Sequence, residues 1–69
     1  MIAQARLREP LVPPVDIAEH FKIPEKTLAE WRARGIGPRY MRIGRYVRYR
    51  WADVEEWLDG QARGGGDAA

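Results

Sequence analysis

The sequence contains no cysteine and a single histidine, His20. Without cysteine there can be no disulfide, no thiolate zinc site and no thiol catalysis. No apolar run approaches the ~20 residues that cross a bilayer. The first residues, 1–6, lack the apolar core of a secretory signal. We therefore expect a soluble, cytoplasmic protein.

The chain is also too short for an elaborate active site. Its 69 residues make one domain at most, and a chain of this size buries only about 60% of its unfolded surface. No glycine-rich phosphate loop precedes a helix, and no set of metal-ligating residues clusters. These absences predict a protein that is not an enzyme, with neither a cofactor nor a metal.

Arginine dominates the centre of the chain. Seven arginines and no acidic residue lie between Glu30 and Asp53, although the formal net charge is only +2. These arginines are Arg32, Arg34, Arg39, Arg42, Arg45, Arg48 and Arg50. A field of one sign on a small protein favours a polyanionic partner, and nucleic acid is the commonest polyanion in a cell.

The first half of the chain predicts two short helices. Leu11–Pro14 leads into the first, because proline suits a first-turn position. Its apolar residues recur at helical spacing, and they are Val15, Ile17, Ala18 and Phe21.

A short connection at Lys22–Ile23 separates the two helices, and Pro24 starts the second. Leu28 and Trp31 form its inward face, and Gly35 lies just beyond its last residue. Two helices with a connection of this length are typical of a helix-turn-helix.

The second half predicts a hairpin and a third helix. Two β-prone stretches, 39–43 and 46–50, are joined at Gly44–Arg45, where a tight two-residue turn fits. Alternation places Val47 and Tyr49 on one face of the second strand. The third helix opens at residues 51–53 with Asp53 at its cap or in its first turn, presents Val54, Trp57 and Leu58 to the core, and ends at Gly60.

These predictions define an α+β, mainly α, winged helix-turn-helix over residues 11–60. Residues 1–10 form either a short helix, with Ile2, Ala3 and Leu7 along one face, or a loose arm, and they are a candidate oligomer contact. Residues 61–69 are expected to be disordered. The large side chains of the expected core are Phe21, Leu28, Trp31, Val47, Tyr49, Trp51, Val54, Trp57 and Leu58.

In a winged helix-turn-helix the second helix lies in the major groove. The candidate residues for that contact point away from Leu28 and Trp31 or lie near the helix start, and they are Glu25, Lys26, Thr27, Ala29, Glu30 and Ala33. Lys26 is suited to guanine and Glu30 to cytosine, while the alanines suit thymine methyl groups. Glu30 has an equally good alternative role as an i, i+4 partner of Lys26 or Arg34.

The hairpin supplies the remaining candidates. Gly44 and Arg45 at its tip are expected in the minor groove or on the backbone, where a narrow groove attracts arginine. The expected phosphate contacts are Arg32, Arg34, Arg39, Arg42, Tyr46, Arg48 and Arg50. Two alternatives stay open: Arg32 and Arg34 as dipole compensation at a helix C-terminus, and the hairpin arginines as protection of an edge strand.

Residues 11–59 resemble the excisionase-like winged helix-turn-helix proteins of phages and mobile elements, within the mercury-resistance-regulator (MerR) superfamily. The matching stretches are Val15–Phe21, Ile23 through Thr27–Leu28 to Trp31–Arg32, Gly37–Pro38, Arg42–Arg45, Val47–Arg50 and Asp53–Leu58. Two departures are Pro24, where relatives carry a capping residue such as serine, and the small side chains of Ala29 and Ala33 on the outward face.

The resemblance implies a recombination directionality factor. Such a protein binds repeated double-stranded sites beside an attachment site, bends the DNA by cooperative assembly with itself, and directs a cognate integrase toward excision. The same family includes small transcriptional regulators of prophage and plasmid genes, which remain an alternative. A third reading is a protein-interaction module that presents the arginine face to an acidic partner.

Overall fold

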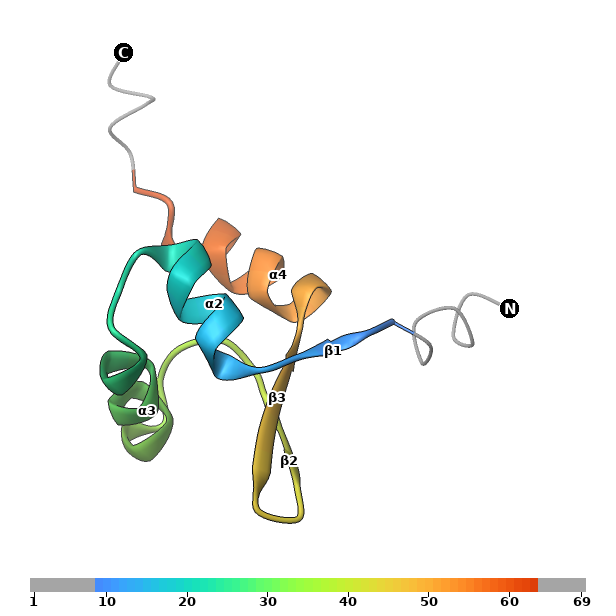
Figure 1. Cartoon of the computed structure of the whole chain (residues 1–69). Coiled ribbons are helices and arrows are strands. Elements are labelled where there is room, and N and C mark those ends of the chain that lie inside the picture. Colours follow the sequence, from blue (N-terminus) through green and yellow to red (C-terminus); the bar gives the residue numbers. More distant parts are fainter. Residues whose placement is uncertain (1–8, 64–69) are drawn as a thin grey trace.

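The computed structural model describes residues 9–63 and shows, within them, three helices and a three-stranded antiparallel sheet. This arrangement confirms the α+β, mainly helical, winged helix-turn-helix (Figure 1). In chain order the elements are β1 (Leu11–Val12), α2 (Pro14–Phe21), α3 (Glu25–Arg34), β2 (Met41–Ile43), β3 (Tyr46–Arg50) and α4 (Trp51–Gln61).

The helix boundaries follow the proline and glycine signals, with one exception. Pro13 and Pro24 occupy the N-cap positions of α2 and α3, and Gly35 ends α3 with a left-handed φ of 74°. The prediction that Gly60 ends the third helix is wrong, because α4 continues to Gln61. The chain leaves α4 through an extended conformation at Ala62, so no left-handed glycine is needed there.

The sheet has one strand more than expected. Leu11–Val12 does not merely lead into a helix: it pairs with β3, Leu11 opposite Arg50 and Val12 opposite Tyr49. A two-residue strand is too short to show alternation, so the sequence carried no signal for it. The strand expected over 39–43 is limited to Met41–Ile43. The two-residue turn is confirmed, since Ile43 pairs directly with Tyr46.

The core lies where α2, α3 and α4 meet the inner face of β3. Its fully enclosed side chains are Ile17, Ala18, Leu28, Tyr49 and Val54. Val15, one of the four apolar residues at helical spacing, lies outside this core and is 49% exposed in the first turn of α2. Only the later part of that helix reaches α3 and β3, so the buried stripe begins at Ile17.

The start of α4 is capped by a residue far away in the sequence. Its N-cap residue, Arg50, provides no side-chain hydrogen bond. Instead, the backbone N–H of Ala52 donates to Oε2 of Glu9 over 3.0 Å, across 43 positions of sequence. A carboxylate satisfies an otherwise orphaned N–H at a helix N-terminus and complements the helix dipole. Glu9 therefore fixes the chain that precedes β1 to the first turn of α4.

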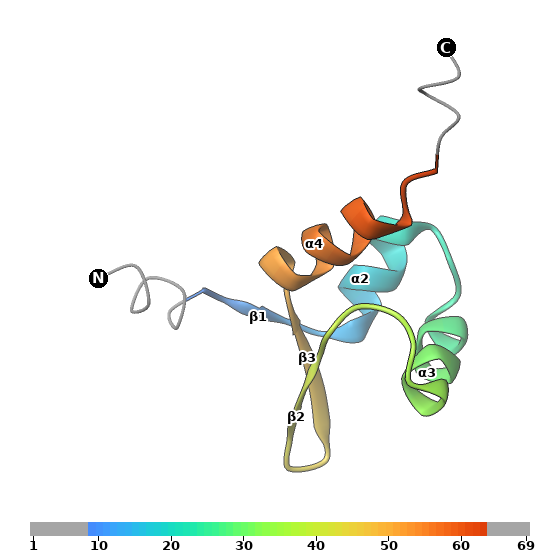
Figure 2. The same cartoon turned by 180° about the vertical axis from the view of Figure 1, so that it is seen from behind.

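Two sides of the molecule differ in the elements that they present. α2 and α4 lie together on one side, while α3 and the β2–β3 hairpin protrude on the opposite side (Figures 1 and 2). The expectations of a short helix with Ile2, Ala3 and Leu7 along one face, and of disorder at the end of the chain, fall largely on residues outside the described range 9–63.

Replacement of Gly37 should destabilise the fold more than the same replacement at Gly35. Both residues have positive φ, 91° and 74°, so alanine costs about 1–2 kcal/mol at either place. Only at Gly37 would the added Cβ lie 3.1 Å from Cε3 of Trp31. We expect Gly37→Ala to lose about 1 kcal/mol more unfolding free energy in urea denaturation than Gly35→Ala. Equal losses would contradict this packing.

Candidate nucleic-acid interface

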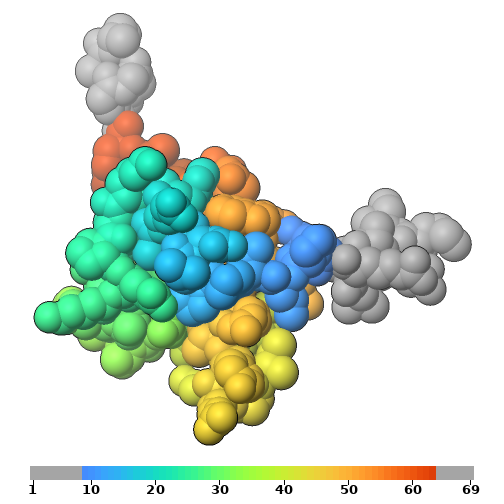
Figure 3. Space-filling model, viewed as in Figure 1, coloured from blue at the N-terminus to red at the C-terminus, as the bar shows by residue number. Residues whose placement is uncertain are grey.

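Charge is divided between the two sides of the molecule. The hairpin region, residues 39–50, holds five arginines and no acidic residue. By contrast, α2 and α4 hold no lysine or arginine, and their acidic residues are Asp16, Glu19, Asp53, Glu55, Glu56 and Asp59. A polyanion is therefore attracted to the side where α3 and the hairpin protrude (Figure 3).

The outward surface of α3 is the one that the helical spacing predicts. Lys26, Ala29, Glu30 and Ala33 are all exposed, whereas Leu28 is completely buried. Glu25 is also exposed, and Thr27 is half-buried near the start of the helix. Because two of these side chains end at Cβ, a duplex can approach the helix closely. Contact of these residues with base edges remains a prediction.

Arg32 has a role inside the protein that sequence reasoning missed. Its Nη1 donates to the hydroxyl of Tyr49 over 3.0 Å, and its guanidinium carbon lies 5.8 Å from the centroid of the Tyr40 ring. Arg32 thus joins α3 to the sheet, while its remaining donors stay free for a phosphate. Arg34, two residues later, is exposed.

The hairpin tip gathers charge around one aromatic ring. Gly44 has the positive φ, 62°, that the turn requires. The guanidinium carbons of Arg45 and Arg48 lie 5.6 and 5.5 Å from the centroid of the Tyr46 ring. Arg48 also donates to the carbonyl of Val47 over 2.7 Å. These contacts hold two positive charges beside a ring that is itself 54% exposed.

The exposed side chain of Ile43, at the hairpin tip, is another feature that sequence reasoning missed. It is 49% exposed and stands directly opposite Tyr46 across the hairpin. Exposed isoleucine at the end of a charged hairpin gives the tip an apolar contact surface. Proteins that bind the minor groove commonly combine basic and apolar side chains in this way. The signal was available, because Ile43 adjoins the predicted turn.

The other candidate arginines are divided by position. Arg39 and Arg42 are exposed on the hairpin side. Arg50 stands at the opposite end of β3 from the tip, about 13 Å away at ~3.3 Å per residue. Its Nε is buried and has no partner among the described residues, as is also the case for Oδ2 of Asp53. The structure therefore groups Arg42, Arg45 and Arg48 on the hairpin, with Arg39 just before it, and separates Arg50 from its tip.

Residues 9–63 contain neither a membrane-spanning helix nor a metal-binding cluster. No helix there is both long and apolar enough to span a membrane. No three side chains of histidine, aspartate or glutamate come together there in a way that would hold a metal ion.

Comparison with known proteins identifies the arrangement. Residues 14–62, which are 49 of the 69, match the family model described as a helix-turn-helix domain. No curated protein sequence matches the chain. The matched region begins with α2 and includes α3, the hairpin and α4. A helix-turn-helix domain binds double-stranded DNA, with the second helix of the motif in the major groove.

Arg32 and Arg34 should separate stability from DNA affinity. Arg32→Ala leaves the buried Tyr49 hydroxyl without its donor, so we expect a loss of about 1–2 kcal/mol in unfolding free energy together with weaker DNA binding. Arg34→Ala should change stability by less than about 0.5 kcal/mol and weaken only DNA binding. Thermal denaturation and a gel shift measure the two quantities. A stable Arg32→Ala variant would contradict the bridging role.

Proposed function

The chain belongs to the helix-turn-helix domain family, and we propose that it is a recombination directionality factor. In this proposal it binds repeated sites on duplex DNA, bends the DNA and directs a phage integrase toward excision. The observation that carries the proposal is the hairpin, whose exposed arginines stand beside a recognition helix with few side chains for reading bases. Such a surface grips and shapes DNA more than it selects a sequence.

The proposed contact of α3 is modest in specificity. Lys26 donates to guanine O6 or N7, and Glu30 accepts from cytosine N4. Ala29 and Ala33 bring the helix close to the groove floor and touch thymine methyl groups. Only two of the four outward side chains of α3 form hydrogen bonds, so this helix fixes register on the DNA with limited base discrimination.

The hairpin supplies the proposed shape recognition. Arg45 enters a narrow minor groove, where the negative potential is strongest. Ile43 and Tyr46 contact the sugar walls of that groove, while Arg42 and Arg48 bind the flanking phosphates. Insertion of an apolar group beside basic ones favours sites that deform easily, and this supports a role in bending.

A single domain of this size needs neighbours to act. One winged module buries about 600–1,000 Å² on DNA, which gives weak binding by itself. Several copies on adjacent sites bind more tightly when they also contact one another. Repeated sites beside an attachment site are therefore the proposed target, in the host cytoplasm, with the cognate integrase as the second partner.

A small transcriptional regulator is the second candidate, because the same surface binds a promoter equally well. Gel shifts with attachment-site DNA and with promoter DNA distinguish the directionality factor from the regulator. They are combined with an in vitro excision assay that contains the cognate integrase. A ladder of complexes on attachment-site DNA and stimulated excision are the expected results. Binding to promoter DNA alone would reject the directionality role. No shift with either DNA at moderate salt would favour an interaction module for an acidic protein.

The salt dependence of binding tests the role of the hairpin. If each copy neutralises about four to six phosphates, log K falls with log salt at about −0.9 per phosphate. Arg45→Ala should reduce that slope by about one unit and weaken binding about tenfold at low salt. The matched control is Arg63→Ala, which removes an exposed arginine beyond α4. It should change neither the salt slope nor the affinity. Unchanged binding by Arg45→Ala would remove the tip from the mechanism.

A further inference from the structure

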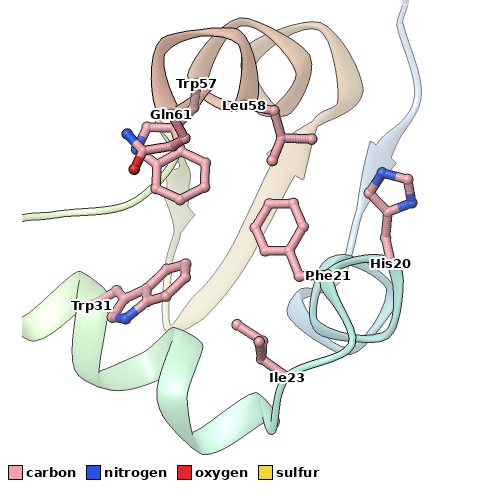
Figure 4. Close-up of a pocket in the computed structure, with 7 residues that line it drawn as sticks. All are labelled: His20, Phe21, Ile23, Trp31, Trp57, Leu58 and Gln61. Atoms are coloured by element: carbon pink, nitrogen blue, oxygen red, sulfur yellow. The ribbon is translucent and has the colours of Figure 1, made fainter. Parts of the chain in front are cut away.

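An aromatic groove lies away from the hairpin, where α2, α3 and α4 converge (Figure 4). The cavity has a volume of about 430 Å³. Its walls are formed by Phe21, Trp31 and Trp57, with ring centroids 5.4–6.3 Å apart. Leu58 and Gln61 of α4 line the same groove.

The groove is lined mainly by apolar side chains. Phe21, Trp31 and Trp57 pack against one another but are only half-buried, and they line the cavity (Figure 4). An aromatic surface left open in this way is typical of a protein contact. α2 and α4, two of the three helices around it, favour a basic partner, because they carry no lysine or arginine and α3 carries charges of both signs. The exposed acidic residues of α2 and α4 are Asp16, Glu19, Glu55, Glu56 and Asp59.

The chain itself contains a segment of that chemistry. Residues 1–8 include apolar Ile2 and Leu7, basic Arg6 and Arg8, and no acidic residue. Apolar side chains fit the aromatic groove, and the arginines complement the acidic surface of α2 and α4. We propose that residues 1–8 of a second copy dock in the aromatic groove.

The position of Glu9 indicates that the groove is filled by the N-terminal segment of a second copy and not by that of the same chain. Its hydrogen bond to Ala52 holds the chain at the first turn of α4, whereas the groove uses Trp57, Leu58 and Gln61 in the other half of that helix. Followed back from α2, β1 runs past the start of α4 and away from the groove (Figures 1 and 2). The described chain therefore begins, at Glu9, on the side of the molecule away from the groove.

This geometry makes the contact directional. One copy offers its N-terminal segment and the next offers its groove, so the two surfaces differ and the contact can repeat in one direction. On DNA such an array matches sites arranged as direct repeats and not as inverted repeats. This part of the inference rests on the proposed binding to repeated sites.

Cysteine crosslinking tests the docking, since the natural chain has no cysteine. The test variant combines Leu7→Cys with Gln61→Cys, and its matched control combines Leu7→Cys with Asp59→Cys. Gln61 and Asp59 are both exposed on α4, but only Gln61 lines the groove. Both are oxidised mildly on duplex DNA with two direct repeats. A disulfide needs Cα atoms about 4.4–6.8 Å apart. We expect covalent dimers at least fivefold more abundant for the test variant.

The outcomes distinguish the alternatives. A crosslinked monomer would overturn docking between copies in favour of docking within one chain, and equal products from test and control variants would overturn the groove as the site. Gel shifts with a single site, under reducing conditions, separate this inference from the DNA-binding proposal. Normal single-site binding without selective crosslinks rejects only the docking, whereas absent binding to any duplex rejects the proposed function.

Discussion

The burial of Tyr49 is the interaction on which the proposed DNA-binding surface depends. Its side chain is completely enclosed in the core, while its hydroxyl accepts a hydrogen bond from Arg32 on α3. Its backbone pairs with Val12 of β1, and its strand forms the hairpin with β2. One residue thus connects the recognition helix, the hairpin and the first strand. The relative position of α3 and the hairpin is set by this packed connection and not by the loop between them.

Because that connection fixes the hairpin to α3, the uneven distribution of charge can orient a bound polyanion. Arginines on a flexible segment would attract DNA without orienting it, whereas a hairpin fixed to α3 presents its charges in one geometry. The acidic helices α2 and α4 are turned away from the same surface, so a duplex meets attraction on one side and repulsion on the other. The small chain achieves orientation through the distribution of charge, because its net charge of +2 is modest.

The order of helices and hairpin could be predicted from sequence because each signal was local. Pro24 and Gly35 bound α3, and Gly44 marks a turn that needs positive φ. Apart from the exposed Ile43 beside the turn, the features that were missed depend on residues distant in sequence. Three such contacts join residues 17 to 43 positions apart. They are the pairing of Leu11–Val12 with β3, the hydrogen bond from Ala52 to Glu9, and the hydrogen bond from Arg32 to Tyr49. No spacing rule reports such contacts. The same limit applies to the aromatic groove, since its walls come from three helices.

The central claim is that α3 and the hairpin together form the DNA-binding surface. Titration of the ¹⁵N-labelled protein with a short duplex, followed by amide chemical shifts, tests it most directly. The account predicts that the largest shifts fall in residues 25–34 and 39–50, with small shifts on the outer faces of α2 and α4. Large shifts concentrated on α2 and α4, with the hairpin unchanged, would contradict it.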